Sequence, residues 1–257
     1  MTRLSNLREM ARTLRANSPA EMIARLFMDA PAKSVDERPG PAPTAVERIR
    51  AAYSRRARDV SKDRYSLTRP ENLFWVQART RTMMSLVSRA GLLPLADKAI
   101  LDVGCGFGQQ LAELEALGAR RSRLAGLDLL EERVAVARDR LGSGANGAPG
   151  ADIRQGSAER LPWPDAFFDL LLQSTMFTSI LEPTIKRTVA KEMLRVLRPG
   201  GAVIWYDFFY DNPRNPDVKG ISARELRSLF PGCKVVLRRT TLAPPLARRL
   251  ASLSFLV

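Results

Sequence analysis

The sequence predicts an α/β fold in which a doubly wound, mostly parallel sheet is preceded by an N-terminal helical extension. Three observations lead to this prediction. From residue 99 onward, short apolar runs alternate with helical patterns, and such alternation is typical of parallel sheets. A glycine-rich turn follows the first apolar run, and an acidic residue closes the second. Both features are typical of the sheet edge where an α/β protein binds its ligand.

The stretch 99–108, AILDVGCGFG, carries the strongest signal in the chain. Its apolar run ends in Asp102, and glycines follow at alternate positions, Gly104, Gly106 and Gly108. A short apolar run stopped by glycine predicts a buried strand. Because glycine adopts positive φ and has no Cβ, the turn can be sharp and a ligand can lie against the backbone. A helix N-terminus with free amide N–H groups comes next, so the stretch predicts a nucleotide site.

The second signal is Asp128, which lies at the carboxyl end of an apolar run, 20 residues after Gly108. An acidic residue at about this interval accepts hydrogen bonds from ribose hydroxyl groups. The dinucleotide fingerprint is G-x-G-x-x-G, whereas this chain has D-x-G-x-G-x-G. The third glycine therefore falls one residue early, and Asp102 precedes the turn.

The apolar periodicity places the other elements along the chain. We expect strands at 99–103, 124–129, 151–155, 168–173 and 202–207, and helices at 108–117, 131–141 and 185–198. A late helix at 222–229 opens with a capping box of Ser222 and Glu225, and a sixth strand is expected at 234–242.

Four blocks of this sequence resemble the class I S-adenosylmethionine-dependent methyltransferases. They are DVGCGFG at 102–108, GLDLL at 126–130, GSAERLPWPDAFFDLLLQS at 156–174 and EMLRVLRPGGAVIWYD at 192–207. The spacing is most similar to the group that contains the ubiquinone and menaquinone biosynthesis methyltransferases, over roughly 95–210. The resemblance implies a Rossmann-like methyltransferase fold, an enzyme, and S-adenosyl-L-methionine as the cofactor. The family's sheet ends in a seventh, antiparallel strand, and the residues after Leu242 do not predict a regular one.

The composition and periodicity, together with the resemblance, suggest a division of the chain into three parts. Residues 1–44 are expected to form an appendage of two short helices and a proline-rich linker. This appendage docks on the protein, is disordered, or lies on an anionic membrane surface. Residues 45–95 are expected to form a helical cap over the cofactor site, with helices at 45–60 and 72–90. Residues 96–257 are expected to form the methyltransferase core.

The resemblance assigns cofactor contacts residue by residue. Asp102 orients the glycine turn or reaches the methionine amino group, and Asp128 binds the ribose. Ser157 stands where the family usually has an acidic residue near the adenine amine, and its hydroxyl group can still accept that hydrogen bond. The full set of expected cofactor-binding residues is Asp102, Gly104, Cys105, Gly106, Phe107, Gly108, Asp128, Leu129, Ser157, Ala158, Gln173 and Ser174.

The chain contains no histidine, so a general base must come from another residue type, or none is needed. The candidates are Tyr206, Asp207 and Tyr210, at and after the fifth strand. Tyr65 and Gln77, from the N-terminal helices, are candidates for contact with the methionine end of the cofactor or with the acceptor. Packing or loop hydrogen bonding is the alternative role for each of them. Methyl transfer to an already nucleophilic acceptor needs mainly alignment.

The net charge of +14 is concentrated in the flanks of the chain. Residues 1–98 carry 19 Lys and Arg against 10 Asp and Glu, and residues 212–257 carry 9 against 2. We expect the helices at 45–90 and the basic segment 212–250 together to line the acceptor site, with Arg55 and Arg56 favouring an anionic acceptor. Solvated surface charge is the alternative explanation. The sequence QSTMF after the fourth strand lacks the (D/N)PP(Y/F/W) motif of nucleobase amine methylases, so specific nucleic-acid binding is not expected.

These features together predict methyl transfer to an O or C atom of a small-molecule or lipid-linked, anionic acceptor. Two other functions stay open: a nucleic-acid methyltransferase or binder that uses the basic flanks, and a non-catalytic cofactor-binding regulator. No metal site is expected. The sequence shows no 18-residue apolar run, no secretory signal and only two cysteines, which predicts a cytoplasmic protein, with peripheral contact at an anionic membrane as an alternative.

Overall fold

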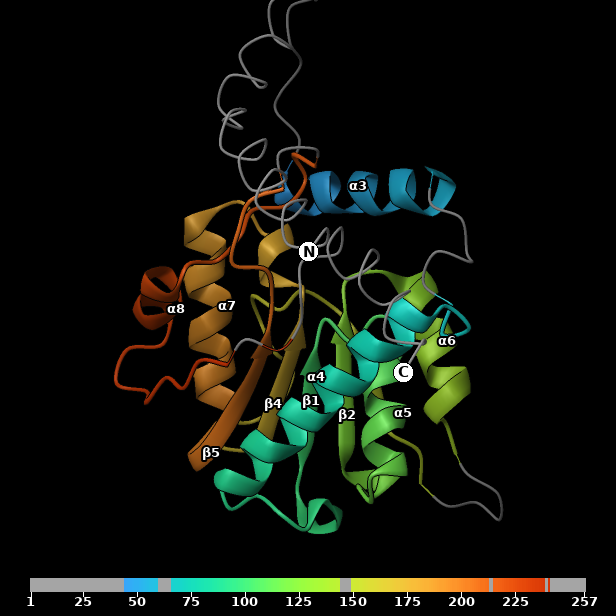
Figure 1. Ribbon diagram of the computed structural model, residues 1–257, viewed down its shortest axis with the longest axis vertical. Helices are drawn as coiled ribbons and strands as arrows, with labels where there is room; N and C mark the ends of the chain where they lie inside the picture. Colours follow the sequence, from blue (N-terminus) through green and yellow to red (C-terminus); the bar gives the residue numbers. More distant parts are fainter. Residues whose placement is uncertain (1–43, 60–65, 144–148, 213–214, 239, 241–257) are drawn as a thin grey trace, which may run out of the picture. The chain divides into compact units, whose positions relative to one another are not determined.

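The computed structural model describes residues 44–59, 66–143, 149–212, 215–238 and 240 (Figure 1). All of them belong to the unit Pro43–Val257. The expected helices within 1–30, the linker up to residue 43 and the residues after 240 lie outside the described part. Within it, no helix is both long and apolar enough to cross a membrane.

Five parallel strands form the sheet, in the order β3-β2-β1-β4-β5. They are β1 Ile100–Val103, β2 Leu124–Asp128, β3 Asp152–Gln155, β4 Phe168–Ser174 and β5 Leu197–Tyr206. The predicted fold class is confirmed. β5 begins five residues before the expected start, because Leu197 already pairs with Phe168. An irregularity in the register follows, and Gly200, with φ +80°, lies in this segment.

Helices cover both faces of the sheet, as expected for a doubly wound fold (Figure 1). On one face, α4 Pro70–Arg89, α5 Gln109–Ala116 and α6 Glu131–Leu141 bury apolar side chains against Ile100 and Leu170. On the other, α7 Pro183–Val196 and α8 Ala223–Leu229 pack against Leu101 and Leu171. Successive residues of β1 and β4 therefore serve opposite cores, which explains the runs of apolar residues in these two strands.

The chain reverses direction across the sheet between β1 and β4, which are neighbours. From β1 the chain proceeds outward to β2 and β3, with α5 and α6 on one face. From β4 it proceeds to β5, with α7 on the opposite face. Such a reversal leaves a crevice beyond the carboxyl ends of the two central strands, where open α/β sheets bind their ligands.

Helix α3, Ala45–Asp59, contacts segments that follow the carboxyl ends of the strands. Its Arg48 forms an ion pair with Glu182 at 3.1 Å, and its Tyr53 hydroxyl group lies 3.3 Å from the Ser179 hydroxyl group. Helix α4 packs instead on a sheet face, with Met83 and Val87 in the core. The division into appendage, cap and core stays a prediction.

The prediction of a sixth strand is wrong for the residues of 234–242 that the structure describes. Residues 234–238 form no ladder, and Val236 and Leu237 are exposed. The apolar run from Val235 to Leu237 favours a strand, but a strand also needs a pairing partner, and none of the described residues pairs with this segment. The residues expected to lack a regular seventh strand lie outside the described part.

The start of α8 is as predicted, because Ser222 Oγ accepts a hydrogen bond from the Glu225 N–H at 3.1 Å.

Candidate functional site

The turn after β1 contains three glycines, and the structure requires glycine at these positions for different reasons. Their φ angles are +80° at Gly104, +54° at Gly106 and +73° at Gly108. A Cβ on Gly108 would come within about 3.1 Å of Ala137 on α6, so this glycine permits close packing of the helix. A Cβ on Gly106 would meet nothing within 4 Å. The backbone at Gly106 therefore borders open space at the end of the sheet.

Asp128 holds this turn in place. Its side chain is 7% exposed, Oδ2 accepts the Gly106 N–H at 2.9 Å, and Oδ1 accepts the Leu130 N–H at 3.0 Å. Each carboxylate oxygen can accept a further hydrogen bond. Orientation of the turn was one of two roles expected for Asp102, and the structure gives it to Asp128. Asp128 is therefore both a support of the turn and an available acceptor beside it.

Asp102, at the end of β1, is 2% exposed, and its Oδ1 has no hydrogen-bond partner among the described residues. Burial raises its pKa to about 7, with repulsion from Asp128 acting in the same direction and the positive charge of Arg79 opposing both. An unpaired buried carboxylate is costly unless a ligand group satisfies it. The second expected role of Asp102, contact with a cationic amino group, fits this environment.

Arg79 is a site residue that the sequence analysis missed. It lies on α4 and acts electrostatically on Asp102, and its Nη2 pairs with Glu113 at 2.9 Å. Its buried Nε has no hydrogen-bond partner among the described residues. The available signal was the spacing: Arg79 precedes the core residues Met83 and Val87 by four and eight positions, which places it on the buried face of α4. Gln77, the residue expected from this helix, is exposed.

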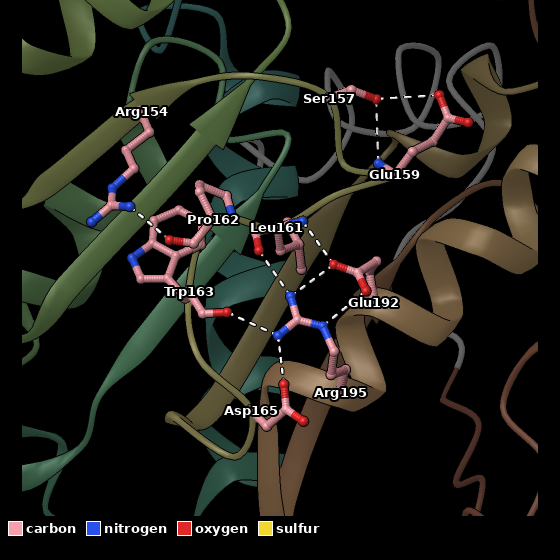
Figure 2. Close-up of polar contacts among 9 residues, drawn as sticks. All are labelled: Arg154, Ser157, Glu159, Leu161, Pro162, Trp163, Asp165, Glu192 and Arg195. Atoms are coloured by element: carbon pink, nitrogen blue, oxygen red, sulfur yellow. Dashed lines mark hydrogen bonds and ion pairs between the residues drawn. The ribbon is translucent and has the colours of Figure 1, made fainter.

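The connection from β3 to β4 carries Ser157 and Ala158, both half-buried. The Gly156 N–H donates to the Asp128 carbonyl group at 2.9 Å, so this segment starts beside the end of β2. The Ser157 hydroxyl group donates to Glu159 Oε1 at 3.2 Å and accepts the Glu159 N–H at 3.3 Å (Figure 2). One acceptor position on the Ser157 oxygen remains for a ligand.

On the other side of the crevice, Gln173 and Asp207 lie together at the ends of β4 and β5. Gln173 is fully buried, its Oε1 accepts the Met176 N–H at 3.2 Å, and its Nε2 lies 3.5 Å from Asp207 Oδ2. Burial raises the pKa of Asp207 to about 6, although hydrogen bonds from Thr178 and the Phe208 N–H lower it. Asp207 is therefore a half-buried carboxylate that is ionised at neutral pH.

The other candidates for a general base have different surroundings. Ser174 is half-buried and pairs in register with Tyr206, which is also half-buried. The side chain of Tyr210 is 81% exposed. Asp207 is thus the candidate with the clearest link to the buried end of β4.

On α3, Arg55 forms an ion pair with Asp217, in which Nη2 lies 2.8 Å from Oδ1 and 3.0 Å from Oδ2. Arg56 is exposed on the same helix, and Tyr65 lies outside the described residues. The Arg133 guanidinium group lies 4.1 Å from the centre of the Tyr53 ring and 5.2 Å from that of Phe107. The glycine turn is therefore linked to α3 through an arginine that lies over two aromatic rings.

A family model described as a methyltransferase domain matches residues 101–205. The chain is 32% identical over 122 residues to an O-methyltransferase, cnsE, of Penicillium expansum. This match covers 48% of this chain and 42% of the relative. It is 32% identical over 113 residues to the ubiquinone/menaquinone biosynthesis C-methyltransferase UbiE of Pseudomonas putida. This match covers 44% of this chain and 43% of the relative. The chain thus spans less than half the length of these curated relatives.

Among solved structures, the fold is similar to that of the YcgJ protein from Bacillus subtilis. The TM-score is 0.50 at 20% sequence identity, and the match covers 67% of this chain and 78% of the other. At this identity the likeness concerns the fold alone. It agrees with the parallel sheet and flanking helices described above.

Proposed function

Residues 101–205 belong to the S-adenosylmethionine-dependent methyltransferase domain family, and from this premise we propose that the chain transfers a methyl group to an O or C atom of a small-molecule or lipid-linked acceptor. The expected family, enzyme class and cofactor are confirmed for this domain. The activity of the whole chain, its acceptor and the anionic character of that acceptor are proposals.

The observation that carries the proposal is the buried Oδ1 of Asp102, which has no hydrogen-bond partner in the described part of the chain. The amino-acid end of S-adenosylmethionine has an ammonium group and a carboxylate group. Asp102 would bind the ammonium group, and the free Nε of Arg79 would bind the carboxylate group. A cation beside Asp102 also removes the cost of an unpaired buried charge.

The remaining cofactor contacts follow the strand ends. Asp128 would accept hydrogen bonds from the ribose hydroxyl groups, and Leu129 would pack against the adenine ring. Ser157 would accept a hydrogen bond from the adenine amine, and the Ala158 N–H would reach a ring nitrogen. Open space at Gly106 lets the cofactor lie against the backbone. The bound cofactor supplies an electrophilic methyl group on sulfur.

On the acceptor side, Asp207 is our candidate for the general base. A carboxylate with a pKa of about 6 is ionised at neutral pH and can still take a proton. It would accept the proton of an acceptor hydroxyl group or of an acidic C–H group at a carboxylate oxygen. Gln173 would orient it through its amide group. Alignment of acceptor and methyl group supplies the rest of the acceleration.

The named relatives include enzymes of both kinds, those that methylate an O atom and those that methylate a C atom. They include the O-methyltransferase cnsE and the C-methyltransferase UbiE. A third, 34% identical over 113 residues, is a phthiotriol/phenolphthiotriol dimycocerosates methyltransferase of Mycobacterium ulcerans. These names favour small or lipid-like acceptors for the present chain as well.

The test is an incubation of the full chain with S-adenosylmethionine labelled in its methyl group, together with separate lipid, small-molecule and nucleic-acid extracts. We expect label in the lipid or small-molecule fraction, with the product identified by mass spectrometry. The Asp128→Ala variant is the control. Cofactor binding without transfer to any fraction would indicate a non-catalytic regulator, and label in nucleic acid would contradict the proposed acceptor class.

A further inference from the structure

Two arginines from outside the β3–β4 connection bind three consecutive backbone carbonyl groups within it (Figure 2). Arg195, on α7, donates from Nη2 to the Leu161 carbonyl group at 2.8 Å and from Nη1 to the Trp163 carbonyl group at 2.9 Å. Arg154, on β3, donates from Nη1 to the Pro162 carbonyl group at 2.6 Å. We call these three contacts the carbonyl clamp.

Each arginine of the clamp is held by acidic partners. Arg195 donates to both carboxylate oxygens of Glu192 at 2.8 Å, and also to Asp165 at 2.8 Å. These bonds keep the pKa of Glu192 below its usual range. Glu192 Oε2 also accepts the Leu161 N–H at 2.9 Å. Both backbone polar groups of Leu161 are therefore bound by a pair of residues one turn apart on α7.

The Arg154 side chain is fixed in a similar way. It donates to Asp152 at 2.8 Å and 2.7 Å, and its guanidinium group lies 4.9 Å from the centre of the Trp163 ring. The Trp163 indole N–H donates to the same Asp152 at 2.9 Å. Because Leu161 and Trp163 are also buried, the segment 161–163 is fixed by both polar and apolar contacts.

The clamp lies just after the residues that the proposed function places at the adenine ring. The connection starts at Gly156, whose N–H is bound by the Asp128 carbonyl group. Ser157 and Ala158 thus lie between two anchored points, Gly156 and Leu161. A segment anchored at both ends loses less conformational freedom when a ligand binds to it.

We propose that Arg195 and Arg154 are positioning residues that hold the Ser157–Ala158 segment in the geometry needed to recognise the adenine amine. This inference rests on the proposed function, because it takes that segment as the adenine contact. The clamp acts through the backbone, since neither arginine needs to touch the cofactor.

The ion pair of Arg195 with Asp165 adds little to folding stability, whereas the pair of Arg195 with Glu192 is more buried, with side chains 29% and 18% exposed. The Arg195 side chain is 29% exposed and that of its partner Asp165 is 78% exposed. Exposed ion pairs of this kind contribute little to folding stability. What the guanidinium groups determine is the path of three successive peptide groups, and so the position of the residues before them.

The test compares two ligands that differ at the purine amine: S-adenosylhomocysteine and S-inosylhomocysteine, in which a carbonyl oxygen replaces that amine. Calorimetric titration of the wild-type chain should give tighter binding of the adenine form. In Arg195→Gln we expect about tenfold weaker binding of S-adenosylhomocysteine and a clear loss of the preference between the two ligands. Arg195→Lys, which keeps one donor for the carbonyl groups, should restore part of both.

Arg198→Gln is the matched control, because Arg198 lies three residues farther along and binds the far end of the same connection. It donates to the Ala166 carbonyl group at 3.1 Å and to Asp169 at 2.9 Å. Its loss should leave the ligand preference unchanged. Equal weakening of both ligands in Arg195→Gln, with the preference intact, would overturn the positioning role.

Hydrogen exchange of the ligand-free chain tests the clamp separately from adenine recognition. Arg195→Gln should speed exchange in residues 157–160, and Arg198→Gln should not. Unchanged exchange there would refute the clamp itself. If exchange rises as expected but the wild-type chain binds neither ligand, the proposed function fails, and the role in adenine recognition fails with it.

Discussion

The carboxylate of Asp128 accepts the backbone N–H of Gly106 at 2.9 Å, and so joins the end of β2 to the glycine turn after β1. Two of the strongest signals in the sequence are therefore one structural unit. The same carboxylate supports the turn and borders the open space at Gly106. Its removal should affect the cofactor both directly and through the turn.

Asp128→Ala should weaken S-adenosylhomocysteine binding by about 1–3 kcal/mol, as for the loss of a buried hydrogen-bond partner. Asp128→Asn should cost less, because its amide oxygen still accepts one of the two backbone N–H groups. Calorimetric titration measures both. Unchanged affinity in Asp128→Ala would remove Asp128 from the cofactor site.

Asp102 should make cofactor binding depend on pH. Its pKa is about 7 in the folded chain, so its charged form increases as pH rises from 6 to 8. Since the ammonium group of the ligand pairs with the charged form, affinity for S-adenosylhomocysteine should rise about tenfold over this range. Asp102→Asn should bind weakly with a flat pH profile. An equally steep profile in this variant would assign the titration to another group.

The same carboxyl group should affect folding stability in the opposite direction. Its folded pKa lies above the unfolded value, so the folded chain binds more protons between about pH 4 and pH 7. The free energy of unfolding should therefore fall as pH rises through this window, in the absence of ligand. Denaturant titration of Asp102→Asn should show a smaller fall, and an unchanged slope would contradict the assignment.

Asp207→Asn should lower the rate of methyl transfer by about two orders of magnitude if the acceptor must lose a proton. The value of kcat/KM for the wild-type chain should rise with pH through about 6, where Asp207 ionises, and this limb should vanish in the variant. Cofactor affinity should stay unchanged. Tyr210→Phe, at an exposed side chain, is the control. Full activity in Asp207→Asn would exclude it as the base.

Arg55 and Arg56 should affect the acceptor and not the cofactor. Replacing both by Gln should raise the KM of an anionic acceptor and leave S-adenosylhomocysteine affinity unchanged. Asp217→Asn is the matched control, because it breaks the ion pair with Arg55 while keeping the positive charge. A similar rise in KM in the control would attribute the effect to the position of α3, and no rise in any variant would contradict an anionic acceptor.

Nucleic acid should bind only weakly and without sequence preference. Affinity for duplex DNA, measured by fluorescence anisotropy, should fall steeply between 50 and about 200 mM salt, as expected for contacts to phosphate groups alone. Nanomolar, sequence-selective binding at physiological salt would favour the nucleic-acid alternative.

The strands and helices of the core were predictable because each buries apolar residues with a clear period. The path after α8 was not, since residues 234–238 have the composition of a strand but pair with no other described residues. At the site, the glycine turn and Asp128 follow from local sequence. Arg79 does not, because its relation to Asp102 depends on how α4 packs against the sheet. The carbonyl clamp likewise joins Arg195 to Leu161, 34 positions apart.

The most direct test of the central claim is calorimetric titration of the full chain with S-adenosylhomocysteine and, separately, with NAD. The D-x-G-x-G-x-G turn, the unpaired oxygen of Asp102 and the free Nε of Arg79 predict measurable binding of S-adenosylhomocysteine and much weaker binding of NAD. Tighter binding of NAD, or no binding of S-adenosylhomocysteine at any pH between 6 and about 8, where Asp102 ionises, would contradict the account.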